Sequence, residues 1–387
     1  MRKYKIGLLP KIIIAIALGI GCAYIFPMWI TRVFVTFNGL FGNFLSFVIP
    51  LIILGLVAPG IAELGKGAGK LLLITVAIAY GSTLFAGFFS YFGCELAYPQ
   101  ILVRDPEFAI LAVTDASAVL PFFTIEMPPV FGVMTALIFA FAIGLGASAV
   151  NAKSLISVLS DFRNIVNLII SKAIIPLLPL FIFGIFLKLG VEGQVATILK
   201  LFIKVILVIF IMHILLLLIQ FSVAGVVVRK NPLRLLVNML PAYFTALGTQ
   251  SSAATIPVTL KQSLKNGVDE ELASFTVPLC ATIHLAGSTL KIVACAFAIM
   301  WMLGMETSLG LYAGFICMLG VTMIAAPGVP GGAIMAALGV LESVLGFDPT
   351  LQALMIALYI TMDSFGTACN VTGDGAIALV VNKFYKK

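Results

Sequence analysis

The sequence predicts an all-α polytopic membrane protein with about eight transmembrane helices and two re-entrant helical hairpins. Of the 387 residues, 61% are hydrophobic and only 10% are charged, more apolar surface than a soluble protein can bury. Apolar segments long enough to cross a bilayer recur along the chain. In the C-terminal part, two apolar stretches carry small, hydroxylic or turn-forming centres, and an interrupted span follows each, which indicates an inverted repeat.

Six apolar segments precede the first hairpin and are expected to be ordinary spans. Segments one to six cover about residues 12–26, 34–62, 71–92, 130–150, 165–189 and 201–228. Between segments three and four lies the only sizeable polar loop, residues 95–129, which is net acidic. Its inner charged residues are Arg104, Asp105, Glu107, Asp115 and Glu126.

The basic residues predict the orientation in the membrane. A net charge of +7 would suit nucleic-acid binding, but the basic residues lie between apolar segments rather than on one soluble face. Cytoplasmic loops are rich in Lys and Arg. We therefore expect the protein in the cell membrane (plasma or inner membrane), with both termini in the cytoplasm and the acidic loop on the outer side. The residues then placed inside are Lys66, Lys70, Lys153, Arg229, Lys230, Arg234, Lys383, Lys386 and Lys387. The first segment resembles a signal peptide, with a faint lipoprotein-like site at Gly19–Cys22, but the later spans favour an uncleaved helix.

The cysteines and histidines do not predict a zinc site or a disulfide framework. The six cysteines are scattered singly without a Cys-x-x-Cys pair, and the chain has two histidines. We expect buried free thiols at Cys22, Cys94, Cys280, Cys295, Cys317 and Cys369.

The two predicted hairpins cover residues 231–266 and 307–347. Their tips are expected within Thr245–Pro257, which is hydroxylic, and Met323–Ala333, which is rich in Pro and Gly. The first hairpin should enter from the cytoplasm and the second from outside, which supplies two gates. The two interrupted spans cover residues 275–303 and 354–381, and their breaks are expected at Ala281–Gly287 and Asn370–Gly373.

Two acids lie in the last apolar stretch. Asp363 and Asp374 flank Asn370–Gly373, a run of weak helix formers. An acid at membrane depth costs about 2.5–3.5 kcal/mol on insertion scales, so it usually has a partner. Acids beside an unwound turn suit the binding site of a cation-coupled transporter. The alternative is an acid that reaches the interface from a helix end, which fits Asp374 better than Asp363.

Four motifs, in order along the whole chain, resemble the dicarboxylate/amino acid:cation symporter family, the glutamate transporter homologues. They are Ser251–Pro257 at the first tip, Ile283–Gly287 in place of an Asn-Met-Asp-Gly motif, Gly328–Gly331 at the second tip, and Asp363 with Asn370–Asp374. The resemblance implies a homotrimer in which each subunit transports by an elevator mechanism. Scaffold helices would come from residues 1–66 and 99–190, and the moving transport domain from residues 67–98 and 191–387.

The resemblance also implies a substrate site. Asp363 would bind the substrate's amino group, a reasonable partner for a desolvated carboxylate. Ser288 and Thr367 would line the pocket. The substrate's α-carboxylate would be held at the two tips and by the Asn370 amide, where free N–H groups suit an anion. The residues implied for that carboxylate are Ser251, Ser252, Gly328, Val329 and Asn370.

One or two sodium sites are implied in the same way. Asp374 would hold one ion together with carbonyl groups of Cys280, His284 and Asn370, all hard oxygen ligands. The second ion would use carbonyl groups of Thr282 and of the second tip near Ile324.

The chain departs from the family pattern at several positions. The family arginine that pairs with an acidic substrate side chain falls at Gly366. In the Asn-Met-Asp-Gly motif, His284 stands for the Asn and Ala286 for the Asp. The third-segment hydroxyl groups of the same sodium site fall at Ile78 and Ala79, so the third family sodium site is expected to be lost.

Lys291, one turn past Gly287, has three interpretations. It could extend toward an interface, as lysines near helix ends do. It could replace the missing arginine and accept an acidic substrate. It could also replace the lost sodium by pairing with an intramembrane acid, which avoids a buried unpaired charge.

His284 could couple transport to protons, or it could be a histidine that only hydrogen-bonds to a neighbour. His213, in segment six, lies in no motif and receives no role.

The leading interpretation is a secondary active symporter driven by sodium, with protons as the alternative ion. Gly366 favours a small neutral amino acid such as serine, threonine or alanine, whereas Lys291 favours aspartate or glutamate. A dicarboxylate without an amino group would be repelled by Asp363. A channel is the alternative, and an enzyme is not expected because no catalytic triad or metal constellation is present.

Overall fold

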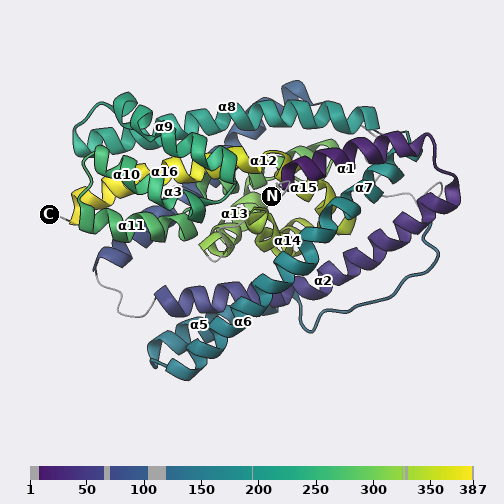
Figure 1. Ribbon diagram of the computed structural model, residues 1–387, viewed down its shortest axis with the longest axis horizontal. Helices are drawn as coiled ribbons and strands as arrows, with labels where there is room; N and C mark the ends of the chain where they lie inside the picture. Colours follow the sequence, from purple (N-terminus) through teal and green to yellow (C-terminus); the bar gives the residue numbers. More distant parts are fainter. Residues whose placement is uncertain are drawn as a thin grey trace, which may run out of the picture.

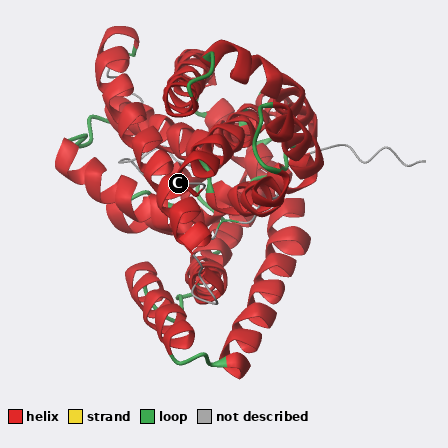
Figure 2. Ribbon diagram, turned by 90° about the vertical axis from the view of Figure 1, so that its left-hand side faces the viewer, coloured by secondary structure: helices red, strands yellow, loops and turns green. Residues whose placement is uncertain are grey.

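The computed structural model describes residues 8–64, 70–102, 119–193, 195–324, 326 and 330–385, and the regular elements in these ranges are all helices (Figures 1 and 2). Several helices begin where the sequence supplies an N-cap. The side chains of Asn231, Ser251, Asp269 and Asp348 accept hydrogen bonds from backbone N–H groups in the first turns of α9 (Pro232–Thr249), α10 (Ser252–Lys265), α11 (Glu270–Ile283) and α15 (Pro349–Thr361).

The spans predicted before the first hairpin all fall on helices. These are α1 (Leu8–Ala23), α2 (Met28–Leu64), α3 (Lys70–Ile101), α5 (Val133–Ala149), the continuous run of α6 (Lys153–Ile169), the π-helical turn η1 (Ile170–Ile174) and α7 (Ile175–Val191), and α8 (Val195–Val228). Within the described ranges, five helical segments are long and apolar enough to cross a membrane, and a bent pair makes a sixth. The predicted spans 12–26 and 130–150 fall on shorter apolar helices.

The polar loop begins later than predicted, because α3 continues to Ile101. Cys94 and Tyr98 are fully buried on this last part of α3, and the Tyr98 ring lies 6.0 Å from that of Phe297. Arg104, Asp105, Glu107 and Asp115 lie outside the described residues. The described end of the loop runs along α2, where Arg32 and Asn43 donate hydrogen bonds to its carbonyl groups (Figure 1).

The predicted hairpins are helical hairpins. In the first, α9 and α10 pack on each other and are joined at Gln250 and Ser251, with Gln250 in the left-handed region at a φ of 53°. In the second, α13 (Leu309–Ile324) packs on α14 (Gly332–Leu345), which begins after Gly331 at a φ of 75°. Glycine takes that conformation without the strain a side chain would add.

The break predicted in the span after the first hairpin is confirmed. Helix α11 ends at Ile283 and α12 (Ala286–Met302) begins three residues later, with extended backbone at His284. The break therefore lies inside Ala281–Gly287.

The break predicted at Asn370–Gly373 is wrong. Helix α16 (Asp363–Tyr385) runs through this segment, and the bend of 63° lies at Met362, between α15 and α16. Helix propensity is a weak preference that packing overrides. The Asn370 side chain bonds to α12 rather than to its own helix, and a Cβ on Gly373 would lie 2.8 Å from Gln220 Oε1. Gly373 leaves the room beside α16 that Gln220 and the His284 ring occupy, rather than forming a turn.

Contacts divide the helices into two groups (Figure 1). In one, α2 packs against α5, α6 and α7, and α1 packs against α7. In the other, α16 is surrounded by α3, α8, α9, α10, α11 and α12. Helices α14 and α15 contact both groups, and they carry the chain to the start of α16.

Candidate functional site

The candidate site lies where α12, α14, α15 and α16 meet. Asp363 begins α16, and its Oδ1 lies 3.3 Å from Nζ of Lys291 in the second turn of α12. Its Oδ2 accepts a hydrogen bond of 2.8 Å from the backbone N–H of Gly331, just before α14. The acid therefore joins the second hairpin to both interrupted spans.

Lys291 is completely buried, so the interpretation in which it extends toward an interface is wrong. Its Nζ lies 3.3 Å from the centre of the Tyr359 ring, a cation–π contact that adds to the ion pair with Asp363. A Cβ on Gly366 would lie 2.9 Å from Nζ and 3.2 Å from Cε of this lysine. The missing side chain at Gly366 thus leaves the room that Lys291 occupies.

Asn370 links α16 to the start of α12. Its Oδ1 accepts hydrogen bonds from the N–H groups of Gly287 (2.8 Å) and Ser288 (3.2 Å), which have no partner within α12. Its Nδ2 donates to Ser288 Oγ at 3.0 Å, and the Tyr359 hydroxyl donates to the same oxygen at 3.1 Å. The structure therefore brings the predicted residues Asn370 and Ser288 together, and connects them to Lys291 through Tyr359.

Gly287 allows this close approach. A Cβ there would lie 2.6 Å from Cys369 Cβ and 2.7 Å from the Gly366 carbonyl oxygen. Gly287→Ala should therefore separate α12 from α16 and lower the free energy of unfolding by about 1–3 kcal/mol. Thermal unfolding of the purified protein measures this. Gly314→Ala is the control, since no atom lies within 4 Å of its added Cβ. An equal loss of stability in both variants would contradict the predicted contact.

A second buried network lies around Asp374. His284 Nδ1 donates to Asp374 Oδ1 at 2.8 Å, and His284 Nε2 lies 3.0 Å from Ser82 Oγ. Gln220, on α8, donates to the same Ser82 oxygen at 3.0 Å. The predicted pair His284 and Asp374 is thus in direct contact, and helices α3 and α8 contribute to it.

Two oxygens of this network have no hydrogen-bond partner among the described residues. Asp374 Oδ2 and Gln220 Oε1 are both buried. A buried, unpaired carboxylate oxygen costs free energy, and a hard cation such as sodium would satisfy it. The donor set around Asp374 therefore fits sodium.

Ser82 and Gln220 were missed at the sequence level. Gln220 could have been found, because a lone amide within the apolar segment 201–228 is expensive and needs a partner. His213, which received no role, is buried and donates through Nε2 to the Gly287 carbonyl oxygen at 3.0 Å. It holds the backbone at the start of α12.

The other predicted sodium ligands are dispersed. The Cys280 carbonyl accepts the His284 N–H at 2.9 Å and lies beside the Asp374 network. Thr282 is exposed and donates to the Leu279 carbonyl oxygen. Ile324 ends α13. The structure therefore groups only part of the predicted set.

The structure describes only some of the residues predicted at the two hairpin tips and in the pocket. Ser251 caps α10 and Ser252 is buried at its first position, on a helix that packs against α16. Thr367 is buried on α16, one turn after Asp363. Gly328 and Val329 lie outside the described residues.

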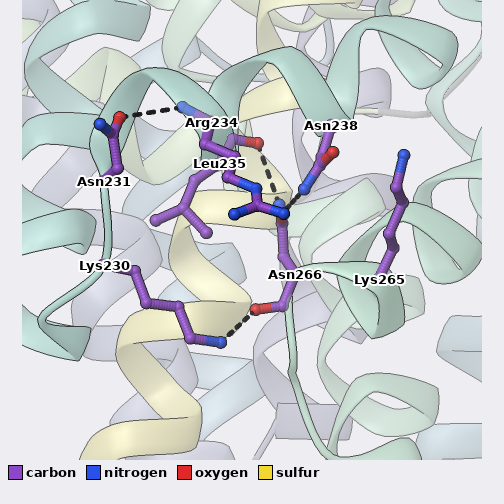
Figure 3. A pocket seen from close by; sticks show the side chains of 7 residues that line it. All are labelled: Lys230, Asn231, Arg234, Leu235, Asn238, Lys265 and Asn266. Carbon is purple, nitrogen blue, oxygen red and sulfur yellow. Dashed lines mark hydrogen bonds between the residues drawn. The ribbon is translucent and has the colours of Figure 1, made fainter.

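A basic cavity lies away from these acids, between the ends of the first hairpin (Figure 3). It has a volume of about 490 Å³ and is lined by Lys230, Arg234 and Lys265 among others. Lys230 donates to the Asn266 carbonyl oxygen at 2.7 Å, and Asn238 donates to the Asn266 side chain. Basic residues beside apolar spans are those that set orientation, and the described residues that line this cavity include no acid.

Comparison with known proteins finds one family model and several transporters that are similar to this chain. The model of the sodium:dicarboxylate symporter family matches residues 8–384. A serine/threonine transporter SstT of Acinetobacter baumannii (strain AYE) is 29% identical, over 96% of this chain and 95% of its own length. The SstT of Acinetobacter baylyi (strain ATCC 33305 / BD413 / ADP1) is 27% identical over 99% of this chain and 98% of its own. Excitatory amino acid transporter 3 of Mus musculus is 36% identical over 42% of this chain and 31% of its own.

Proposed function

The chain belongs to the sodium:dicarboxylate symporter family, and from this premise we propose that it imports a small neutral amino acid together with sodium. The main observation in support is the buried Asp363, which contacts the buried Lys291 and a backbone N–H of the second hairpin. A carboxylate placed in this way can bind a substrate ammonium without solvent competing for it.

Serine, threonine or alanine is the preferred substrate. Gly366 supplies no charge for an acidic side chain, and Lys291 already pairs with Asp363. Two of the relatives named above are serine/threonine transporters, which supports this choice. Aspartate and glutamate are the second choice, supported by the excitatory amino acid transporter and by the presence of a lysine. The channel interpretation is not favoured, because the family is one of symporters.

Sodium would bind at Asp374, with carbonyl groups of Cys280, His284 and Asn370. The unpaired Asp374 Oδ2 supports this assignment. A second ion would bind near Thr282 and Ile324. The third family site would be lost, which is supported by the His284 ring lying between Asp374 and α3.

We further propose a homotrimer with elevator movement and cytoplasmic termini, in the plasma or inner membrane. Helices α1, α2, α5, α6 and α7 would form the scaffold, and α3 with α8 to α16 the moving domain. The helices of each group pack mainly on one another, which supports this division, and α14 and α15 of the moving domain contact the scaffold.

The test is thermal stabilisation of the purified protein by a panel of amino acids, with and without sodium. A ligand that binds only the folded protein stabilises it by about 2.7 kcal/mol at 100 times its Kd. Serine, threonine or alanine should raise the melting temperature more in sodium than in potassium, and labelled substrate should accumulate in vesicles along a sodium gradient. No sodium-dependent effect for any amino acid would contradict the proposal.

Protons are the alternative coupling ion, favoured by the hydrogen bond between His284 and Asp374. If this histidine carries the transported proton, His284→Asn should abolish the pH dependence of uptake. An unchanged pH profile would mean that His284 is not the coupling site. The His213→Asn variant is the control, because His213 bonds to a carbonyl group rather than to an acid.

A further inference from the structure

Both oxygens of Asp363 are occupied within the protein. Oδ1 pairs with Lys291 at 3.3 Å and Oδ2 accepts the Gly331 N–H at 2.8 Å. The side chains of Lys291 and Asp363 are 0% and 6% exposed, so the pair is removed from water. A substrate ammonium that binds Asp363 must therefore compete with an ammonium that already belongs to the chain.

Lys291 can move away from Asp363 and still keep a contact of its own, because a second group lies against its ammonium. Its Nζ also lies 3.3 Å from the centre of the Tyr359 ring, so a cation–π contact holds it on a second side. The three atoms nearest to an ideal Cβ on Gly366 all belong to the end of this lysine, so the lysine fills the space that Gly366 leaves beside α16. A small movement of Nζ along the ring would free Oδ1.

We propose that Lys291 is a tethered counter-ion that alternates with the substrate ammonium on Asp363. The carboxylate then keeps a cationic partner in the loaded and in the empty carrier. Since an unpaired charge in a low-dielectric interior is strongly unfavourable, this partner would allow the empty carrier to return without a cation from solution at Asp363. The inference rests on the proposed function, because it assumes that Asp363 binds a substrate ammonium.

The test compares two transport modes of Lys291→Met in proteoliposomes. Net uptake starts with vesicles that contain no substrate and requires the empty carrier to return. Exchange starts with unlabelled substrate inside, and the carrier crosses loaded in both directions. We expect net uptake to fall at least about tenfold relative to exchange, because only the empty carrier loses its counter-ion. Amino-acid affinity should be equal or tighter, since a competitor has been removed.

Chemical rescue gives a second readout. Methylammonium inside the vesicles can pair with Asp363 in place of the lysine ammonium, and should restore net uptake of Lys291→Met while leaving the wild type unchanged. Lys204→Met is the matched control, because the Lys204 ammonium bonds to the Ile101 carbonyl oxygen rather than to an acid. We expect wild-type ratios of net uptake to exchange for this control.

Gly366→Ala tests the same inference without removing the charge. Its methyl group would lie 2.9 Å from Lys291 Nζ and should displace the lysine from Asp363. The ratio of net uptake to exchange should fall in this variant too. If Lys291→Met does not fold, the ratio measured for Gly366→Ala tests the proposal instead.

Three results would overturn the proposal. An equal loss of both modes together with weaker binding would show that Lys291 contacts the substrate. Unchanged ratios in a folded Lys291→Met or in Gly366→Ala would show that Asp363 needs no tethered cation. A failure of methylammonium to restore net uptake would point to a structural role. Failure of the proposed function itself would be visible separately, as wild-type protein without sodium-dependent uptake or exchange of any amino acid.

Discussion

Replacing Asp363 with asparagine is expected to abolish amino-acid binding and to destabilise the protein. The substitution removes the carboxylate that we assign to the substrate ammonium, and it leaves Lys291 fully buried without its acid. Removal of one partner from a buried ion pair costs about 3–5 kcal/mol. Thermal unfolding and ligand-induced stabilisation, measured on the same purified protein, report the two effects.

The double variant Asp363→Asn with Lys291→Met separates stability from binding. It removes the unpaired ammonium, so stability should recover while amino-acid binding stays lost. Asp161→Asn, at an exposed position of α6, is the control for loss of an acid. Wild-type amino-acid affinity in Asp363→Asn would refute the assignment of this residue. Equal stability of the single and double variants would show that Lys291 finds another partner.

Asp374→Asn is expected to remove sodium binding with little effect on the fold. The amide oxygen of asparagine can still accept the hydrogen bond from His284 Nδ1, which now measures 2.8 Å. The charge that attracts the cation is lost, as is the carboxylate oxygen that has no hydrogen-bond partner in the part of the chain that the structure describes. We expect the sodium affinity to fall by more than about tenfold, a change of 1.4 kcal/mol or more.

The measurement is the sodium-dependent shift in melting temperature without amino acid. Asp161→Asn again serves as the control and should keep the wild-type shift. If Asp374→Asn retains the full sodium response, the ion binds elsewhere, and the sites near Thr282 and Ile324 become the ones to test. A large loss of stability in the absence of sodium would instead assign Asp374 a structural role.

Much of the fold could be predicted from local features of the chain. Apolar segments of membrane length mark the long helices, and hydroxylic or Pro-Gly tips mark the hairpins, because backbone at membrane depth must bond within helices or against protein. The break after Ile283 was also predictable. The break at Met362 was not, since the weak helix formers Asn370 and Gly373 indicate a different place.

The candidate site was also only partly predictable from the sequence. Asp363 and Asp374 could be singled out because acids in an apolar span are expensive. The partners of these acids could not be read from the sequence, since Lys291 lies 72 residues from Asp363 and His284 lies 90 residues from Asp374. Three interpretations of Lys291 therefore remained at the sequence level, and burial excluded one of them.

By itself the sequence determined that this is a helical membrane protein with two hairpins and two interrupted spans, because hydropathy and turn residues act over short distances along the chain. The tertiary structure decided which charges meet. Packing places Lys291 in the room left by Gly366, turns the Asn370 side chain onto the start of α12, and joins His284 to Asp374. Such pairings depend on how helices from distant parts of the chain approach one another, and no local pattern encodes that.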